Sequence, residues 1–207
     1  SGKFDWAKDP KRQPMLNNPD PSYHGMIWTE FAKAVGPIAY IVRARFVGLR
    51  DLGPALPPQS AFQIIQGLET VSLRMEKHCS NAAKVAEYLS NHNKVSRVIY
   101  AGLDEGEAGE RANKYLKGGH GALCGIELKG GKASGEKFIN NLNMFYHVAN
   151  IGDARSLAIH PASTTHSQLS DEDMESAGVN PSYVRLSIGI EHIDDIIEDL
   201  KNALDAA

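Results

Sequence analysis

Cysteine is scarce in this sequence, and only Cys79 and Cys124 occur among its 207 residues. The two lie far apart in the chain and in apolar surroundings, which indicates small buried side chains rather than a disulfide framework or a metal site. Such sparing use of cysteine is typical of a reducing compartment, so we expect a cytoplasmic protein. The chain also lacks an apolar run as long as a membrane-spanning helix.

Neither sign of charge dominates: 22 basic and 25 acidic residues give a net charge of -3. This balance provides no electrostatic basis for binding nucleic acid or an anionic membrane. The first residues, SGKFDWAKDPKRQP, have neither an initiator methionine nor the apolar core of a signal peptide, and we expect either processing or a chain cut from something longer. At 207 residues, the chain is long enough for one large domain or two small ones. Its hydrophobic content of 42% is ordinary for a soluble globular protein.

The first half is predicted to be loop and helix. Four prolines (Pro10, Pro14, Pro19 and Pro21) exclude a regular helix over residues 1–25, while interleaved aromatic side chains predict an ordered, docked loop. Apolar spacing predicts helix over residues 29–49, interrupted at Pro37 into two short helices or a kinked one. A long helix over residues 59–91 is expected to bridge two domains, with the boundary near Val71.

The second half alternates strands with helices, which favours an α/β fold. Strands are predicted at residues 95–100, 122–128, 144–151 and 183–190, with a further extended segment at 157–160. Helices are predicted near 112–116, 134–142, 171–177 and 193–204. The strands are expected to form one sheet with helices on a single face. Residues 117–121 (KGGHG) are interpreted as a turn, because a strand rather than a helix N-terminus follows them.

Arg185 is the most informative single residue. It alternates with the apolar residues of a strand-like run, so its side chain is expected to point away from their face. A planar guanidinium suits a carboxylate, because it donates two parallel hydrogen bonds. Asn150, which ends another apolar run, is a second group suited to an anion. The alternative is that Arg185 pairs with an acidic side chain of the chain itself.

Histidines in the segment 156–166 invite a metal or acid–base interpretation. His160, Thr165 and His166 lie close in sequence, but their spacing lacks a third metal ligand. We therefore expect structural hydrogen bonds there and no metal site.

Two segments carry a family resemblance. SLAIHPASTTH (156–166) and VRLSIGIEHIDD (184–195) resemble the C-terminal signature of the Cys/Met-metabolism enzymes that use pyridoxal phosphate. The residues Asn150 to Asp153, together with the polar insert near the start, are similar to the subgroup that acts as O-acetylhomoserine sulfhydrylase. The resemblance covers essentially the whole chain, which corresponds to about the second half of such an enzyme.

The resemblance implies a fold and a division into domains. It implies the C-terminal portion of a fold-type I transferase, with an antiparallel-rich sheet in the small domain. Residues 1–70 would end the cofactor domain, including an entrance-loop insert and the start of the interdomain helix, and residues 71–207 would form the small domain. Tyr23 and His24 would lie near the substrate entrance; the alternative is that they only anchor their loop.

The resemblance also implies chemistry for the whole enzyme. Sulfide or methanethiol replaces acetate on O-acetylhomoserine, giving homocysteine or methionine. Arg185 matches the arginine that grips the substrate carboxylate, and Asn150 the position that assists it, where many relatives have serine. No lysine here follows a Ser-x-Thr stretch, the context of the cofactor lysine, so no catalytic residue is assigned and the chain alone is expected to be inactive. The missing N-terminal part is expected to hold most of the cofactor, within a homotetramer.

Two alternatives stay open. Within the family, the chain could belong to a methionine or cystathionine γ-lyase, although Asn150 and the N-terminal insert argue against this. Outside it, the chain could be a non-catalytic fragment that persists as an association partner, because apolar surface left by a missing domain favours oligomers.

Overall fold

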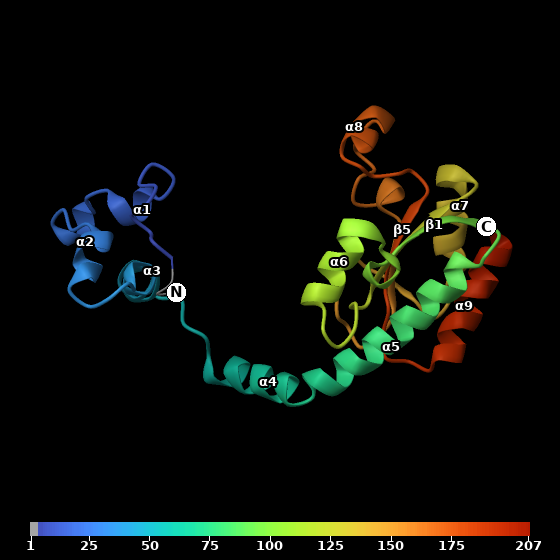
Figure 1. The fold of residues 1–207 in the computed structure, drawn as a ribbon, viewed down its shortest axis with the longest axis horizontal. Helices are drawn as coiled ribbons and strands as arrows, with labels where there is room; N and C mark the ends of the chain where they lie inside the picture. The colour runs from blue at the N-terminus through green and yellow to red at the C-terminus, as the bar shows by residue number, and fades with distance from the viewer. Residues whose placement is uncertain (1–3) are drawn as a thin grey trace. The chain divides into compact units, whose positions relative to one another are not determined.

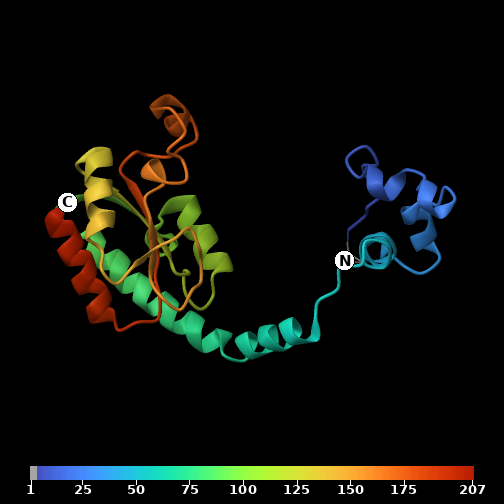
Figure 2. The ribbon, with the colours of Figure 1, turned by 180° about the vertical axis from the view of Figure 1, so that it is seen from behind.

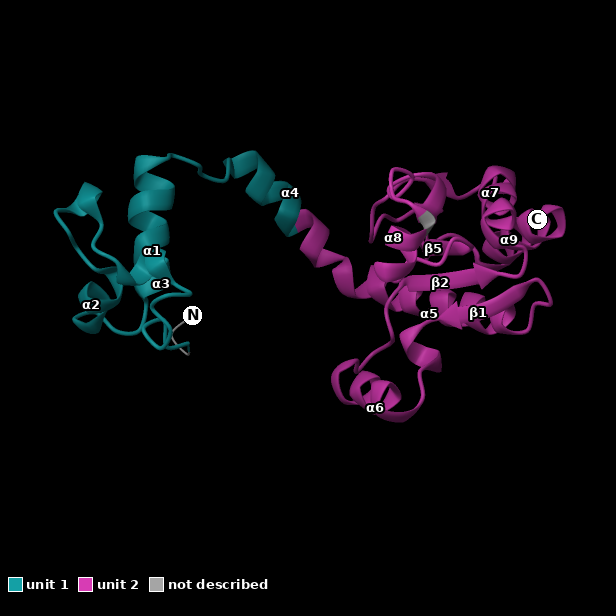
Figure 3. Cartoon of the chain, turned by 90° about the horizontal axis from the view of Figure 1, so that it is seen from above, with its two compact units in different colours: residues 1–65 teal, residues 66–207 magenta. Residues whose placement is uncertain are grey.

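The computed structural model describes residues 4–207, apart from the side chain of Asp171. The chain divides into two compact units, residues 1–65 and 66–207, which are coloured separately in Figure 3. The division falls within helix α4 (Pro58–Glu69), a few residues before the predicted boundary near Val71. The assignment of these parts to a cofactor domain and a small domain stays a prediction.

The first unit is built from short helical segments around a small core. These are α1 (Pro14–Asn17), the 3-10 turn Pro21–Tyr23, α2 (Trp28–Lys33), α3 (Ala39–Arg43) and a π-helical segment, Ala44–Asp51. The interruption around Pro37 is confirmed. The exclusion of helix from the first 25 residues was wrong for α1, because its proline stands in the first turn, where the missing N–H costs no hydrogen bond.

The aromatic residues of this unit hold its loop in place, as the sequence predicted. Trp28 is completely buried, and its indole N–H donates to Asp20 at 3.0 Å. The ring of Tyr23 lies 4.9 Å from that of Trp28 and 5.9 Å from that of Phe46. Trp6 stacks on Tyr40 at 5.5 Å. Each contact ties the loop to a neighbouring helical segment.

The predicted long helix is two helices. Helix α4 ends at Glu69 and α5 (Val71–Ser90) begins after Thr70, whose φ and ψ are -113° and 6°. Arg74 bridges the break: its Nη2 donates to the Gly67 carbonyl at 2.5 Å and its Nε to the Thr70 hydroxyl at 3.4 Å. A side chain that bonds a carbonyl of the preceding turn is a recognised cause of a helix kink.

The second unit contains one five-stranded sheet in the order β1-β2-β5-β4-β3. Its strands are β1 (Val95–Ile99), β2 (Leu123–Leu128), β3 (Tyr146–His147), β4 (Leu157–Ile159) and β5 (Tyr183–Ser187). All pairs are antiparallel except β3 with β4, which is parallel. The predicted antiparallel-rich sheet is thus confirmed, and the extended segment at 157–160 supplies a strand beside β5.

The predicted strand at 144–151 is much shorter in the structure. The backbone N–H groups of Asn143, Met144 and Phe145 all donate to the buried carboxylate of Asp199, at 2.9, 2.9 and 3.4 Å. Amides engaged by a side chain do not pair with a neighbouring strand, so β3 begins only at Tyr146. Beyond β3, the N–H of Val148 donates to the Tyr146 carbonyl at 3.1 Å and that of Ile151 to Asn150 Oδ1 at 2.9 Å, so the strand is not continued there.

The main core lies on one face of the sheet. Helices α5, α7 (Gly131–Asn141) and α9 (Ile193–Ala206) pack there, as Figure 1 and Figure 2 show from opposite sides. The sheet contributes the alternate residues of β2 and β5, and α9 contributes the apolar residues on one side of the helix. The fully buried members include Ile126, Val184, Leu186, Ile196, Leu200 and Leu204. The intervening residues of β5, Arg185 among them, belong to the opposite face.

The remaining elements connect this framework. They are the 3-10 turn Ala101–Leu103, α6 (Gly106–Tyr115), the 3-10 turn Pro161–Ser163 and α8 (Asp171–Ser176). Ser170 caps α8, its hydroxyl accepting from the N–H of Asp173 at 3.1 Å. Residues 117–121 form an irregular link between α6 and β2, as predicted. Among the described residues, each helix is too short or too polar to cross a membrane.

The two cysteines differ in environment, which leads to a first prediction. Cys124 is 1% exposed, and burial raises the pKa of its thiol to about 12, whereas Cys79 is partly exposed. At about pH 8, only about one Cys124 thiol in 10⁴ is ionised, and the thiolate is the reactive form. A thiol reagent is therefore expected to label Cys79 alone in the native chain and both residues in denaturant. Equal native labelling rates would contradict this burial.

Candidate functional site

Arg185 lies in the middle of β5 with a strand on each side. It is paired with Gly125 of β2 and with Ile159 of β4. Its neighbours Val184 and Leu186 are fully buried in the main core, which turns the arginine side chain to the other face. The alternation in the sequence is therefore confirmed. A side chain on a central strand is held by two ladders of backbone hydrogen bonds, which gives the guanidinium a rigid base.

The guanidinium has a neighbour but no counter-charge in this part of the protein. Its Nη2 donates to the main-chain carbonyl of Asn150 at 3.3 Å. No carboxylate of residues 4–170 or 172–207 forms an ion pair with Arg185 within 4.0 Å. The alternative of a structural ion pair thus finds no partner in the described chain. A guanidinium carries several N–H donors, so most of them are available to another acceptor.

The main chain of Asn150 lies beside the guanidinium, and its side chain is a second group suited to an anion. The residue is exposed, and its Oδ1 accepts the N–H of Ile151 at 2.9 Å. With the oxygen engaged, the side-chain NH₂ is the group that remains for a ligand. Asn150 and Arg185 lie 35 residues apart in sequence, and the fold places them in contact. The pair offers N–H donors and one positive charge, a combination suited to a carboxylate.

Tyr183 forms a wall beside the arginine that the sequence analysis did not single out. A Cβ added to Gly125 would lie 2.5 Å from Cε2 and 2.8 Å from the hydroxyl oxygen of Tyr183. The ring therefore covers Gly125, directly across from Arg185. Burial raises the pKa of Tyr183 more than the nearby arginine charge lowers it, so the phenol stays neutral at neutral pH. A glycine within a strand often marks a place where another group approaches the backbone closely, so Gly125 was the signal for this contact that the sequence contained.

The loop after β3 is also held by residues that sequence reasoning missed. Glu191 accepts the backbone N–H of Ser156 at 2.6 Å and its hydroxyl at 2.9 Å. Asn81 of α5 donates to the carbonyls of Gly189 and Glu191 at 3.0 and 2.9 Å. Both Ser156 and Glu191 stand within the two segments that carry the family resemblance, but neither stood out by residue type.

Comparison with known proteins places the chain in a family. Residues 18–205 match the sequence profile of the Cys/Met metabolism PLP-dependent enzymes. The chain belongs to this family.

Individual relatives agree in sequence and structure. The chain is 51% identical to an O-acetyl-L-homoserine sulfhydrylase of Leptospira meyeri over 98% of this chain and 47% of that protein. It is 48% identical to a homocysteine synthase of Schizosaccharomyces pombe over 100% of this chain and 48% of that protein. A crystal structure of a putative O-acetylhomoserine (thiol)-lyase from Campylobacter jejuni, which contains a pyridoxyl-lysine phosphate, superposes with a TM-score of 0.81 at 42% identity, over 96% of this chain and 46% of that one. The chain spans about half the length of the curated relatives it matches.

That the cofactor lysine lies outside this chain stays a prediction. The donors gathered at Arg185 are a guanidinium and an amide, with no lysine among their hydrogen-bond partners in residues 4–207. Three lysines are engaged elsewhere: Lys94 at the end of α9, Lys33 with Glu30, and Lys117 with the Asn113 carbonyl. No step is therefore assigned to pyridoxal phosphate on the residues of this chain.

Tyr23 and His24 lie in the first unit. The Tyr23 hydroxyl donates to Asp51 at 2.7 Å, and burial first, then the Asp51 carboxylate, raises the pKa of Tyr23. His24 is exposed and adopts the left-handed conformation, with φ 55°. These contacts fit the alternative in which Tyr23 anchors its loop. The role of both residues near a substrate entrance stays a prediction.

His160 has a structural environment. It is completely buried; its Nε2 lies 2.8 Å from the Pro181 carbonyl and its Nδ1 2.8 Å from the Ser163 hydroxyl. A carbonyl only accepts, so Nε2 donates to it. His166 lies beside the hydroxyl of Thr165 at 2.9 Å. The expected structural hydrogen bonds are present, and the described residues bring together no group of three potential metal ligands from His, Cys, Asp and Glu.

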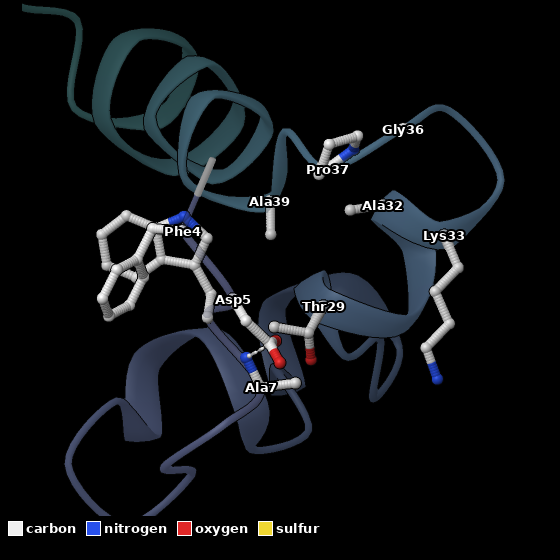
Figure 4. Close-up of a pocket in the computed structure, with 10 residues that line it drawn as sticks. Phe4, Asp5, Ala7, Thr29, Ala32, Lys33, Gly36, Pro37 and Ala39 are labelled. Atoms are coloured by element: carbon white, nitrogen blue, oxygen red, sulfur yellow. Dashed lines mark hydrogen bonds between the residues drawn. The ribbon is translucent and has the colours of Figure 1, made fainter. Parts of the chain in front are cut away.

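The first unit contains a separate cavity of about 460 Å³, shown in Figure 4. Its charged groups are engaged by their own neighbours. Asp5 accepts the N–H of Ala7 at 3.0 Å, and Lys33 extends away from the other labelled side chains and pairs with Glu30 at 2.7 Å. The cavity thus lacks the converging free polar groups that mark a ligand site.

Proposed function

We propose that this chain is the C-terminal part of an O-acetylhomoserine sulfhydrylase and supplies the substrate-carboxylate site of the full-length enzyme. The observation that carries the proposal is a central-strand arginine beside Asn150 with no carboxylate partner among the side chains of residues 4–170 and 172–207. Relatives named as sulfhydrylases and a homocysteine synthase support the choice of substrate. In the reaction, the thiol sulfur bonds to the γ-carbon, acetate departs with the electron pair, and homocysteine or methionine results.

The residues of this chain bind and orient the substrate. Arg185 donates two parallel hydrogen bonds to the carboxylate, and the Asn150 amide donates a third. Because both groups are fixed to β5 and its neighbouring loop, they set the position of the substrate's reacting carbon. The ring of Tyr183 keeps water from one side of the ion pair, which strengthens it. Pyridoxal phosphate, when bound by the rest of the enzyme, supplies the electron sink.

Helix α4 supports an association with the rest of the enzyme. It presents large apolar side chains that are more than half exposed, including Phe62 at 55%, Ile65 at 54% and Leu68 at 61%. Apolar surface gathered on one helix is typical of an interface. In the proposal, the missing N-terminal part and further copies cover it, in a cytoplasmic homotetramer.

The full-length protein is expected to convert O-acetylhomoserine and sulfide into homocysteine and acetate in equal amounts. Its reaction is followed by measuring both products and by testing methanethiol in place of sulfide. Release of an α-keto acid and ammonia instead would identify a γ-lyase and overturn the proposal.

The 207-residue chain alone is expected not to retain pyridoxal phosphate, because its lysines lack the family context and some already bond to other groups. The chain is incubated with the cofactor, passed through gel filtration and examined by absorption. A bound-cofactor band that survives would show that a lysine of this chain completes a site. The full-length protein, treated in the same way, is the positive control.

A further inference from the structure

We propose that Glu191 is a positioning residue for the Arg185–Asn150 site, holding in register the loop that carries Asn150. The inference rests on the proposed function of that site. Glu191 stands after β5 on the same segment as Arg185, and Asn150 stands before β4 on the same segment as Ser156. Glu191 and Ser156 therefore lie on the same two segments as Arg185 and Asn150. We call the end with Glu191 and Ser156 the far end, and the end with Arg185 and Asn150 the site end.

The site end of these segments is held weakly. Arg185 donates to the Asn150 carbonyl at 3.3 Å, and the N–H of Gly152 donates to the Ser187 hydroxyl at 3.4 Å. Both distances are longer than the usual 2.9–3.0 Å of such bonds. Asn150 and Gly152 are exposed, so water competes for their polar groups. These two bonds by themselves give the loop little fixed geometry.

The far end is held strongly. Ile190 donates to the Ala154 carbonyl at 2.9 Å, Glu191 accepts both the backbone N–H and the hydroxyl of Ser156, and that hydroxyl oxygen accepts the N–H of Gly189 at 2.9 Å. Ser156 is completely buried. Hydrogen bonds to an ionised carboxylate are roughly twice as strong as neutral ones. The bonds around Glu191 therefore fix the position of the loop 150–156, including Asn150.

The segment that carries Glu191 is itself fixed to the main core. Asn81 is 1% exposed and donates to the carbonyls on both sides of Ile190, those of Gly189 and Glu191. A Cβ at Gly189 would contact the Glu191 carboxylate and lie 2.5 Å from the Ser156 nitrogen. The two segments pack closely at this point, so a displacement of the Glu191 side chain moves the loop that carries Asn150.

The test compares variants of the full-length enzyme loaded with pyridoxal phosphate. Glu191→Gln keeps the shape of the side chain but turns one acceptor into a donor that faces a donor of Ser156. We expect KM for O-acetylhomoserine to rise about 10- to 100-fold, with kcat reduced much less, because the carboxylate site is displaced rather than removed. Glu198→Gln, on the exposed side of α9, is the matched control and is expected to match the wild type.

A second variant separates positioning from general destabilisation. Ser156→Ala removes the hydroxyl bonds but keeps the backbone N–H that Glu191 accepts, so a smaller rise in KM is expected. In an Asn150→Ala background the effect of Glu191→Gln on KM should shrink, because the group that it positions is gone. A role in overall stability would instead add fully to the effect of Asn150→Ala.

Amide hydrogen exchange supplies a readout that needs no activity. In the Glu191→Gln variant, amides of residues 151–156 should exchange at least ten times faster, while those of β2 and β5 keep their protection. An unchanged KM and unchanged exchange would overturn the positioning role. If the wild-type enzyme shows no sulfhydrylase activity, the proposed function fails instead; if Arg185 variants lose substrate affinity while Glu191→Gln binds like the wild type, only the present inference fails.

Discussion

Replacing Arg185 with alanine in the full-length protein is expected to raise KM for O-acetylhomoserine about 100- to 1,000-fold. Losing one partner of a desolvated, hydrogen-bonded charge pair costs about 3–4 kcal/mol, which corresponds to that change in affinity. Arg185 has no competing carboxylate among the described side chains, which exclude that of Asp171, so its charge is available to the substrate. Lysine at this position should recover only part of the affinity, because an ammonium does not reproduce the planar pair of donors.

The control for this experiment is another arginine of the same sheet. Arg97 of β1 has a 66% exposed side chain and pairs with Glu127 at 3.6 Å, so Arg97→Ala is expected to change KM little. An analogue of O-acetylhomoserine in which a carboxamide replaces the carboxylate gives a sharper comparison. The wild type should bind this analogue weakly, and Arg185→Ala should bind the analogue and O-acetylhomoserine equally well. Retained preference for the acid in Arg185→Ala would show that another group binds the carboxylate.

Replacing Asp199 with alanine is expected to destabilise the second unit by about 3–5 kcal/mol. Asp199 is 7% exposed and accepts three backbone N–H groups from the turn between α7 and β3. Without it these donors lose their acceptor in a largely buried place, and each unsatisfied donor costs about 1–3 kcal/mol. Urea unfolding of the 207-residue chain, followed by circular dichroism, measures the loss as a lower midpoint.

The matched variant is Glu198→Ala, one residue earlier on the exposed side of α9. It should leave the urea midpoint almost unchanged, because an exposed carboxylate of a helix interior contributes little. Asp199→Asn keeps one acceptor and should fall between the two. Equal midpoints for Asp199→Ala and Glu198→Ala would show that the turn finds other acceptors.

Much of the framework followed from local patterns. The alternation of apolar residues around Arg185 predicted the face of the sheet on which its side chain lies, because successive side chains of a strand point to opposite faces. The break near Pro37, the cap at Ser170 and the stripe of α9 each depend on residues within a few positions of one another. Family membership likewise followed from two contiguous motifs, and the sequence profile confirms it.

Other features were set only by contacts between distant residues. The long predicted helix is interrupted at Thr70, where Arg74 bonds back to the carbonyl of Gly67, and the glycine by itself did not predict a break. The predicted strand at 144–151 begins late because Asp199, more than 50 residues later, accepts the N–H groups of Met144 and Phe145.

The candidate site shows the same division. The sequence determined that Arg185 and Asn150 are suited to an anion, since that depends on residue type and local alternation. Their contact, the ring of Tyr183 over Gly125 and the hold of Glu191 on Ser156 were decided by the pairing of β5 with its neighbours. A hydrogen bond across 35 residues leaves no periodic signal in the chain, because it depends on sheet register rather than on the spacing of side chains.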